Sequence, residues 1–286
     1  MGVHISAARE ISYATTAKTR RGRAVIRAIE NSTGRIRVIR QVRGYDKAMS
    51  AGQVFWDVVP NMCGLKLDIV SGSLDNIPKT GPVVLLSNHP FGMLDGLMLG
   101  QILSRSRGDF KILAHRVFAR VKDLDNEILP ICFDETREAM ALNLNTRKEA
   151  LKYLADGGAI GIFPGGSVSS PSRRFGRPMD PKWRTFSAKM IAKSDATVVP
   201  IFFDGYNSRR FHMFGKVNRT VRTALLISEF KRRMNKPVRV HIGKPLDRDA
   251  LETYVKDPTA MMDFLRTSTY NLSANDINDD EYGFDF

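Results

Sequence analysis

Cysteine is scarce in this chain, and long hydrophobic runs are missing. Among 286 residues only Cys63 and Cys132 are cysteines, and no CxxC pair occurs. A disulfide framework and a zinc site of paired thiolates are therefore excluded, and we expect two buried free thiols in a reducing compartment. No stretch approaches the roughly 18 apolar residues of a spanning helix, and residues 1–10 have no signal-peptide core. Any membrane contact is expected to be peripheral.

Several chemical signatures are also absent. There is no Walker motif, no HExxH pair and no complete nucleophile elbow, and the sequence has no internal repeat. His4, His115, His212 and His241 are scattered along the chain, so we expect no metal site. No RNA-binding strand signature or helix-turn-helix spacing is recognisable, which argues against a nucleic-acid partner.

Acidic residues are outnumbered by basic ones, 30 to 44, and the net charge is +14. Residues 1–50 alone hold eleven Arg and Lys against three acids, whereas residues 276–286 hold five acids and no base. The basic excess favours an anionic membrane surface or an acidic partner. It leaves open one non-enzymatic alternative, a basic protein that binds membranes or nucleic acid, which rests on the charge alone.

The chain divides into three parts by composition. Residues 1–60 predict a basic region of two amphipathic helices, at 19–31 and 35–49, followed by Val54, Phe55 and Trp56. These helices either lie on an anionic bilayer or pack on the rest of the protein, because both arrangements produce the same periodicity. Residues 61–270 form the main domain, and residues 271–286 an acidic tail that is solvated or loosely docked.

Within the main domain, apolar strands alternate with helices. The strands are predicted at 65–69, 83–87, 111–114, 159–163, 197–203 and 238–242, and the helices at 96–105, 146–155, 185–194, 221–235 and 247–267. This alternation predicts an α/β fold with a mixed, largely parallel sheet covered by helices.

The most informative motif follows the strand at 83–87. Asn88 and His89 end that strand, Pro90 and Gly92 interrupt the chain, and Asp95 opens a helix. In a continuous helix, residues six apart diverge, but this broken turn lets Asp95 fold back to His89. A carboxylate on one ring nitrogen would make the other a better base. An isolated pair of this kind is more often a helix cap than a catalytic dyad.

A second motif, which ends the strand at 159–163, makes the catalytic interpretation the stronger one. It comprises Phe163, Pro164, Gly165, Gly166 and Ser167, a tight turn whose backbone amides could hold an oxyanion or a phosphate. Arg173 and Arg174 follow shortly afterwards and suit the carboxylate or phosphate of a head group. A third apolar strand contains Val199, Pro200 and Ile201, and its proline suggests a sheet edge or a bulge.

In this order, the three motifs resemble the lysophospholipid acyltransferase superfamily. Its members share an Asn-His-x4-Asp block, a Phe-Pro-Glu-Gly block and a Val-Pro-Ile/Val block, and the resemblance covers residues 63–246. Two departures, the five residues between His89 and Asp95 and Gly165 in place of the glutamate, look like the hemolysin-like branch that includes ornithine-lipid acyltransferases. The resemblance implies a glycerolipid acyltransferase-like fold with His89 as general base and Asp95 as its partner. Asn88, residues 163–167, Arg173 and Arg174 would bind substrate.

The resemblance also implies the reaction and its setting. A fatty acyl chain would pass from an acyl carrier protein or CoA thioester, the only co-substrate expected, to the hydroxyl of a lyso-lipid. The branch favours a lyso-aminolipid such as lyso-ornithine lipid, while lysophosphatidic acid is the alternative acceptor. The enzyme would act as a peripheral protein on the cytoplasmic face of the cell membrane.

Overall fold

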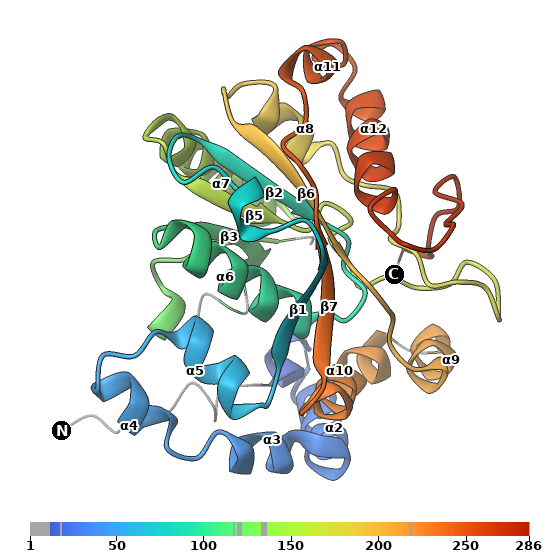
Figure 1. The fold of residues 1–286 in the computed structure, drawn as a ribbon. Coiled ribbons are helices and arrows are strands. Elements are labelled where there is room, and N and C mark those ends of the chain that lie inside the picture. Colours follow the sequence, from blue (N-terminus) through green and yellow to red (C-terminus); the bar gives the residue numbers. More distant parts are fainter. Residues whose placement is uncertain are drawn as a thin grey trace.

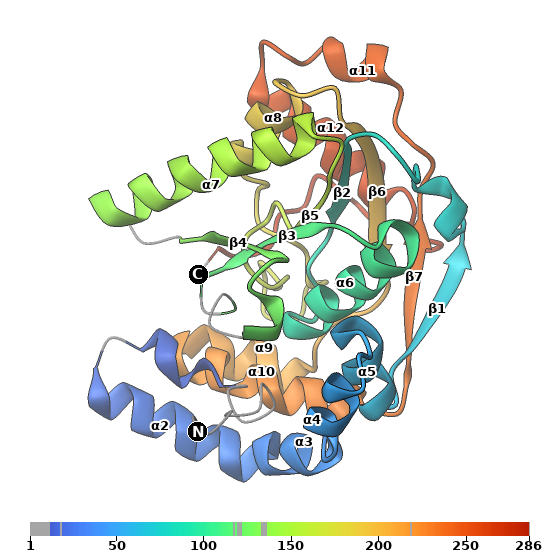
Figure 2. The same cartoon turned by 90° about the vertical axis from the view of Figure 1, so that its left-hand side faces the viewer.

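A computed structural model describes residues 12–17, 19–116, 118, 122–132, 136–217 and 219–285. In this part of the chain, seven strands form one sheet in the order β1-β7-β6-β2-β5-β3-β4 (Figures 1 and 2). Neighbouring strands are parallel, except for the antiparallel pair β6 and β7. The predicted mixed, largely parallel sheet is confirmed. The strands are β1 (Lys66–Ser71), β2 (Val83–Ser87), β3 (Lys111–His115), β4 (Ile128–Ile131), β5 (Ala159–Ile162), β6 (Thr197–Phe203) and β7 (Pro237–Ile242).

Helices cover both faces of this sheet, and the central strand β2 is buried along its whole length. Val83 and Leu85 share one apolar core with helices α5, α6 and α10, whereas Val84 and Leu86 share another with α7, α8 and α12. Alternate residues of a strand face opposite sides, so an apolar run without alternation requires two covered faces. The helices of the main domain are α5 (Phe55–Met62), α6 (Met93–Arg107), α7 (Arg137–Ala155), α8 (Phe186–Ile191), α9 (Arg209–Val217), α10 (Arg219–Arg233), α11 (Arg248–Glu252) and α12 (Pro258–Tyr270).

Three predictions about these elements were wrong. Strand β4 was not expected, because Pro130 interrupts a short apolar run, yet β4 lies at the sheet edge where proline is tolerated. Pro200 suggested an edge or a bulge, but β6 is internal. Pro200 lies opposite Gly243, beyond the last residue of β7. Its missing N–H therefore removes no hydrogen bond between β6 and the paired part of β7. The helix expected at 247–267 is two helices, since Pro258 opens α12.

The N-terminal region packs on the main domain. Helices α2 (Arg20–Glu30), α3 (Ile36–Gln41) and α4 (Tyr45–Ser50) lie beside α10 and α5 (Figure 2). Ile26, Tyr45 and Trp56 are buried in the protein interior. Of the two arrangements open for the amphipathic stripes, the structure has the packed one, although Val25 and Ile36 stay exposed. Among the described residues no helix combines the length and apolarity that crossing a bilayer requires.

The acidic tail is docked more closely than expected. The N–H of Gly283 donates to the carbonyl of Asp180 at 2.8 Å, and the Ser170 hydroxyl donates to the carbonyl of Phe284 at 2.7 Å. Arg266 also donates to the carbonyl of Glu281 at 2.8 Å. Backbone hydrogen bonds of this kind do not depend on side-chain charge, which is why the acidic composition did not predict them. Both cysteines are buried free thiols, as predicted.

Candidate active site

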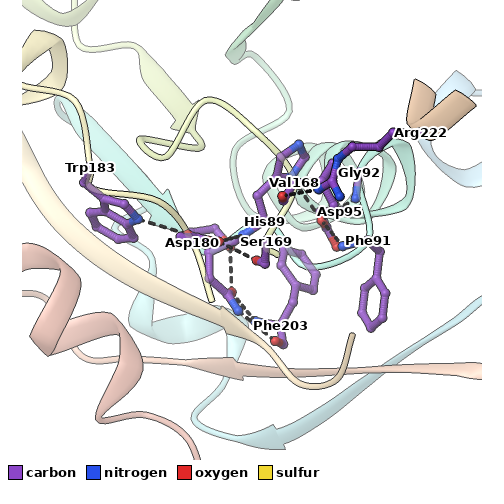
Figure 3. Close-up of polar contacts among 12 residues, drawn as sticks. His89, Phe91, Gly92, Asp95, Val168, Ser169, Asp180, Trp183, Phe203 and Arg222 are labelled. Carbon is purple, nitrogen blue, oxygen red and sulfur yellow. Dashed lines mark hydrogen bonds and ion pairs between the residues drawn. The ribbon is translucent and has the colours of Figure 1, made fainter. Parts of the chain in front are cut away.

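The first two sequence motifs meet at the carboxyl ends of the central strands, and the third, residues 199–201, lies within β6 beside them. Strand β2 lies between β6 and β5, and all three run in parallel. Their carboxyl ends therefore lie side by side, as is usual for ligand sites in open α/β sheets. Asn88 and His89 follow β2, the glycine-rich turn follows β5, and Asp204 follows β6. Figure 3 shows the polar contacts around His89 and Asp95.

His89 and Asp95 are in contact. The Nδ1 atom of His89 lies 3.0 Å from Oδ2 of Asp95, and the carboxylate is fully buried while the imidazole is 18% exposed. The same Oδ2 accepts hydrogen bonds from the N–H groups of Phe91, at 2.8 Å, and Gly92, at 2.9 Å. Gly92 makes the fold-back possible, because its φ of 85° is one that side-chain-bearing residues rarely adopt. Nε2 of His89 is thus the ring nitrogen left for a substrate.

The buried carboxylate is held at an energetic cost. Burial raises the pKa of Asp95, while the His89 contact and the two backbone N–H groups lower it by smaller amounts. When the pKa of a group is higher in the folded than in the unfolded protein, the free energy of unfolding falls as the pH rises through that folded-state pKa. The ionised form of Asp95 is therefore a source of instability that the site retains, which is common at functional positions.

We expect Asp95→Asn to raise the melting temperature at neutral pH. The amide keeps one oxygen for the N–H groups of Phe91 and Gly92, and it removes the buried charge. The gain should shrink as the pH falls and vanish below 3.8, the ordinary pKa of the carboxyl group, because Asp95 is then protonated in both the folded and the unfolded state. Thermal unfolding at several pH values measures this, with the exposed Asp195→Asn as control. An equal loss of stability at every pH would show that the carboxylate's bonds outweigh its charge.

The glycine-rich turn places Phe163 beside the histidine. The two ring centroids are 4.3 Å apart and the planes are inclined by 31°, so Phe163 supports the imidazole from one side. Gly166 has a φ of 69°, and its N–H donates to the carbonyl of Phe163 at 3.0 Å. The N–H of Gly166 therefore closes the turn and is not free to bind an oxyanion. The expectation that both Gly165 and Gly166 donate to a substrate is wrong for Gly166. Gly165 keeps the candidate N–H.

Two other predicted contacts in this region differ from expectation. The side chain of Asn88 is buried, donates to the carbonyl of Phe203 at 2.9 Å and accepts from the N–H of Phe203 at 2.7 Å. It therefore clamps β2 to β6, and the expected substrate contact is corrected. The carbonyl of Pro164 accepts from the N–H of Arg184 at 3.0 Å. By contrast, the hydroxyl of Ser167 is buried without a partner among the described residues, so it remains available to a substrate.

Asp180 was missed by sequence reasoning and lies at the centre of the site (Figure 3). Its fully buried carboxylate accepts from the His89 N–H at 3.1 Å, from the Ser169 hydroxyl, and from Nε1 of Trp183 at 2.9 Å. Ser169 in turn donates its N–H to the carbonyl of His89 at 2.8 Å. The backbone of His89 is thus held on both sides. A single aspartate 91 residues from the histidine gives no spacing signal.

The basic residues are arranged differently from the prediction. Arg222, which the sequence did not single out as a site residue, is buried and donates to the carbonyl of Val168 at 2.7 Å. Burial lowers its pKa to about 10, and its guanidinium lies 4.6 Å from the centroid of the Phe211 ring. Arg173 and Arg174 are both exposed. Of these two, Arg174 lines a groove, whereas Arg173 does not.

That groove has a volume of about 370 Å³ and lies between the loop of residues 171–178 and the segment after β6. Its polar lining includes Arg174, Arg177, Arg209 and Asn207. Asn207 is buried, and neither polar atom of its amide has a hydrogen-bond partner among the described residues. Buried amides are normally paired, so this one can still be satisfied by a ligand.

Comparisons with known proteins identify the family of the chain. The profile of a family described as Acyltransferase matches residues 52–278. The chain belongs to this acyltransferase family, and the predicted membership of the lysophospholipid acyltransferase superfamily is confirmed.

Two curated proteins named lyso-glycine lipid O-acyltransferase are similar to it. The one from Phocaeicola vulgatus is 25% identical over 79% of this chain and 80% of its own length. The one from Bacteroides thetaiotaomicron is 28% identical over 70% of this chain and 73% of its own length. Among solved structures, the 1-acyl-sn-glycerophosphate acyltransferase PlsC from Thermotoga maritima matches with a TM-score of 0.46 and 14% identity, covering 92% of this chain and 87% of that one.

Proposed function

We propose that this protein transfers a fatty acyl chain from a thioester to the hydroxyl of a lyso-lipid, with His89 as general base. The observation that carries the proposal is the 3.0 Å contact between Nδ1 of His89 and the buried Asp95 carboxylate. A carboxylate at Nδ1 fixes the proton there, so that Nε2 can accept one. The imidazole is partly exposed, whereas its Nδ1 atom and the Asp95 carboxylate are buried, so Nε2 is the nitrogen that we propose a substrate reaches.

The reaction needs no covalent enzyme intermediate. Nε2 takes the proton from the acceptor hydroxyl while its oxygen attacks the thioester carbonyl. The C–S bond then breaks, and the departing thiolate takes the same proton from the imidazolium, so the base is regenerated. Asp95 stabilises the transient imidazolium without being protonated itself. The N–H of Gly165 and the hydroxyl of Ser167 are our candidates for the developing oxyanion.

For the acceptor, we propose a lyso-lipid whose head group is an amino acid with a free carboxylate. The relatives named for lyso-glycine lipid support this class, and lyso-ornithine lipid belongs to it as well. Arg174 and Arg209, with the amide of Asn207, provide cationic and polar groups for a carboxylate in one groove. Lysophosphatidic acid is the competing acceptor, because arginines also bind phosphate.

The donor and the location are also proposals. We propose an acyl carrier protein as the donor of the acyl chain, because its acidic surface is complementary to a protein with a net charge of +14. The lipid acceptor requires the site to reach a bilayer, and we propose a peripheral position on the cytoplasmic face of the cell membrane.

The two adjacent arginines provide a matched test of the head-group groove. We expect Arg174→Ala to raise the apparent KM for the acceptor about tenfold with little change for the donor, since a charge-assisted hydrogen bond contributes about 1.5–3 kcal/mol. Arg173→Ala, which lies outside the groove, should leave the acceptor KM unchanged. Both are measured with the acceptor dispersed in detergent micelles. If Arg174→Ala weakens only donor use, the groove belongs to the carrier.

The proposed function itself is tested by thiol release. The purified protein is mixed with acyl-CoA or acyl carrier protein and with lyso-glycine lipid, lyso-ornithine lipid or lysophosphatidic acid in turn, and products are identified by mass spectrometry. We expect a diacylated product with one of the two amino-acid lipids, and the loss of that product with His89→Ala. A product only from lysophosphatidic acid would overturn the acceptor class. No product with any of the three would overturn the proposal.

A further inference from the structure

Helix α9 presents an unusual face to solvent. Its packing against the protein is provided by Phe211 and His212, both of which are buried. Arg209 and Arg210 are exposed, and the Phe214 side chain is 55% exposed. The apolar side chain on this outward face is therefore not required by the core. A helix whose free face combines basic and large apolar residues has the composition of elements that lie in a membrane interface.

The loop of residues 171–178 has the same character. Phe175 is 78% exposed, and the guanidinium of Arg174 lies 5.5 Å from its ring centroid. Figure 1 shows this yellow loop and the orange helix α9 projecting on the same side of the molecule. The two are adjacent, because residues of both line the groove of about 370 Å³. We name the exposed residues of the two segments the arginine–aromatic surface: Arg173, Arg174, Phe175, Arg209, Arg210 and Phe214.

The charge of this surface is of one sign. Residues 171–178 and 206–214 contain five arginines and no aspartate or glutamate. Asp204, which also lines the groove, is paired with Arg239 at 3.0 Å. The described acidic tail approaches through a backbone carbonyl, that of Asp276, to which Arg177 donates at 3.5 Å. The arginine–aromatic surface is therefore suited to an anionic partner.

We infer that the arginine–aromatic surface docks the protein on an anionic lipid bilayer. Arg173 and Arg210 lie at the phosphates, while Arg174 and Arg209 stay at the groove proposed for the acceptor. Phe175 and Phe214 enter the boundary between the lipid head groups and the acyl chains. An acidic protein partner would satisfy the arginines too, but it would leave unexplained the exposure of two separate phenylalanines on projecting segments. Isolated aromatic side chains of this kind are typical of insertion between lipids.

The position of the surface fits this role. The loop begins two residues after Ser169, whose N–H donates to the carbonyl of His89. Helix α9 follows β6, whose last residue, Phe203, is clamped by Asn88. Docking there brings the groove between the two segments, and the carboxyl ends of β5 and β6 that precede them, to the bilayer. This orientation rests on the proposed function, because an active site needs to face a membrane only if its substrate is a lipid.

Vesicle binding tests the inference without any substrate. Full-length protein is sedimented with vesicles of phosphatidylglycerol and phosphatidylcholine in equal parts, and with vesicles of phosphatidylcholine alone, at low and high salt. We expect the wild type to prefer the anionic vesicles. Phe175→Ser with Phe214→Ser should lower partitioning at least tenfold even at high salt, because insertion is salt-resistant. Arg173→Gln with Arg210→Gln should lower it about tenfold at low salt and little at high salt.

A matched control lies on α7, which is far from α9 in Figure 1. Met140 and Leu144 are exposed apolar residues there, and Met140→Ser with Leu144→Ser should bind vesicles as the wild type does. Circular dichroism establishes that each variant is folded. The inference is overturned if the wild type does not bind, if both surface variants bind like the wild type, or if the α7 control loses as much.

An acyl carrier protein is the competing partner for the arginine–aromatic surface. The phenylalanine and arginine double variants distinguish it from a bilayer. We expect them to retain their KM for acyl carrier protein thioester when the acceptor is in micelles. A raised donor KM with normal vesicle binding would assign the surface to the carrier and overturn the inference. Failure of the proposed function is distinguishable, because it would abolish product formation by the wild type while leaving its vesicle binding intact.

Discussion

Replacing His89 with alanine should reduce acyl transfer by about two to four orders of magnitude, which is the usual contribution of a general base. The imidazole is the only group at the described site that combines access to substrate with a carboxylate on its second nitrogen. The side chain is partly exposed, and the hydrogen bonds that hold its backbone come from Asp180 and Ser169 and do not involve the ring. Folding should therefore be intact. Single-turnover kinetics with a thioester and a lyso-lipid measure the chemical step directly.

Two further variants make this result interpretable. His89→Gln retains a hydrogen-bonding group but cannot accept the proton, so it should be as impaired as His89→Ala. Asp95→Asn should also lose most activity, because the ring loses the charge that orients and stabilises its protonated form. His241 is a buried histidine that the proposed chemistry does not involve, so His241→Gln serves as a control. A folded His89→Ala enzyme with near-normal turnover would contradict the mechanism.

Replacing Asp180 with alanine should have the second-largest effect, on both stability and activity. The change leaves three donors without their acceptor: the His89 N–H, the Ser169 hydroxyl and Nε1 of Trp183. Each buried donor left unpaired costs about 1–3 kcal/mol, so we expect a loss of several kcal/mol in the free energy of unfolding. Denaturant unfolding measures this loss, with the exposed Asp195→Ala as the control.

The activity of an Asp180 variant distinguishes positioning from simple structural support. Asp180→Asn keeps the shape and one acceptor oxygen, so it should fold, yet its amide N–H₂ group faces donors where an oxygen is required. Because Asp180 contacts the backbone of His89, we expect kcat to fall by one to two orders of magnitude with KM nearly unchanged. A merely structural role would lower the melting temperature and leave kcat normal at a temperature where the variant is folded.

Much of the fold could be predicted because its signals are local. The apolar runs of β2 and β6 were placed at their true bounds, since strands buried on both faces need only short stretches of Val, Leu, Ile and Phe. The contact of His89 with Asp95 was predictable for the same reason. Only five residues separate them, and Gly92 between them adopts a φ of 85°, which other residues rarely reach, so that the chain can turn back. The order of the motifs then indicated the acyltransferase family, whose profile matches the chain.

Other features depend on groups far apart in sequence. The amphipathic stripes of α2 to α4 are compatible with either a bilayer or a protein surface. The packing of α2 on α10 and of α4 on α5 decided between the two. Asn88 was predicted to bind substrate, but its amide is hydrogen-bonded to the backbone of Phe203 at the end of β6. A hydrogen bond between distant segments has no characteristic spacing along the chain.

The sequence by itself determined the alternating α/β pattern, the His89–Asp95 pair and the glycine-rich turn beside it, because each is encoded within a few consecutive residues. The tertiary structure alone decided which carboxylate holds the histidine backbone, which arginine lines the groove and where exposed aromatics meet basic charge. Asp180, Arg174 and the pair Phe175 and Phe214 acquire these positions only when β5, β6 and their following segments are brought together by the sheet. Packing fixes such neighbours, and no local pattern specifies them.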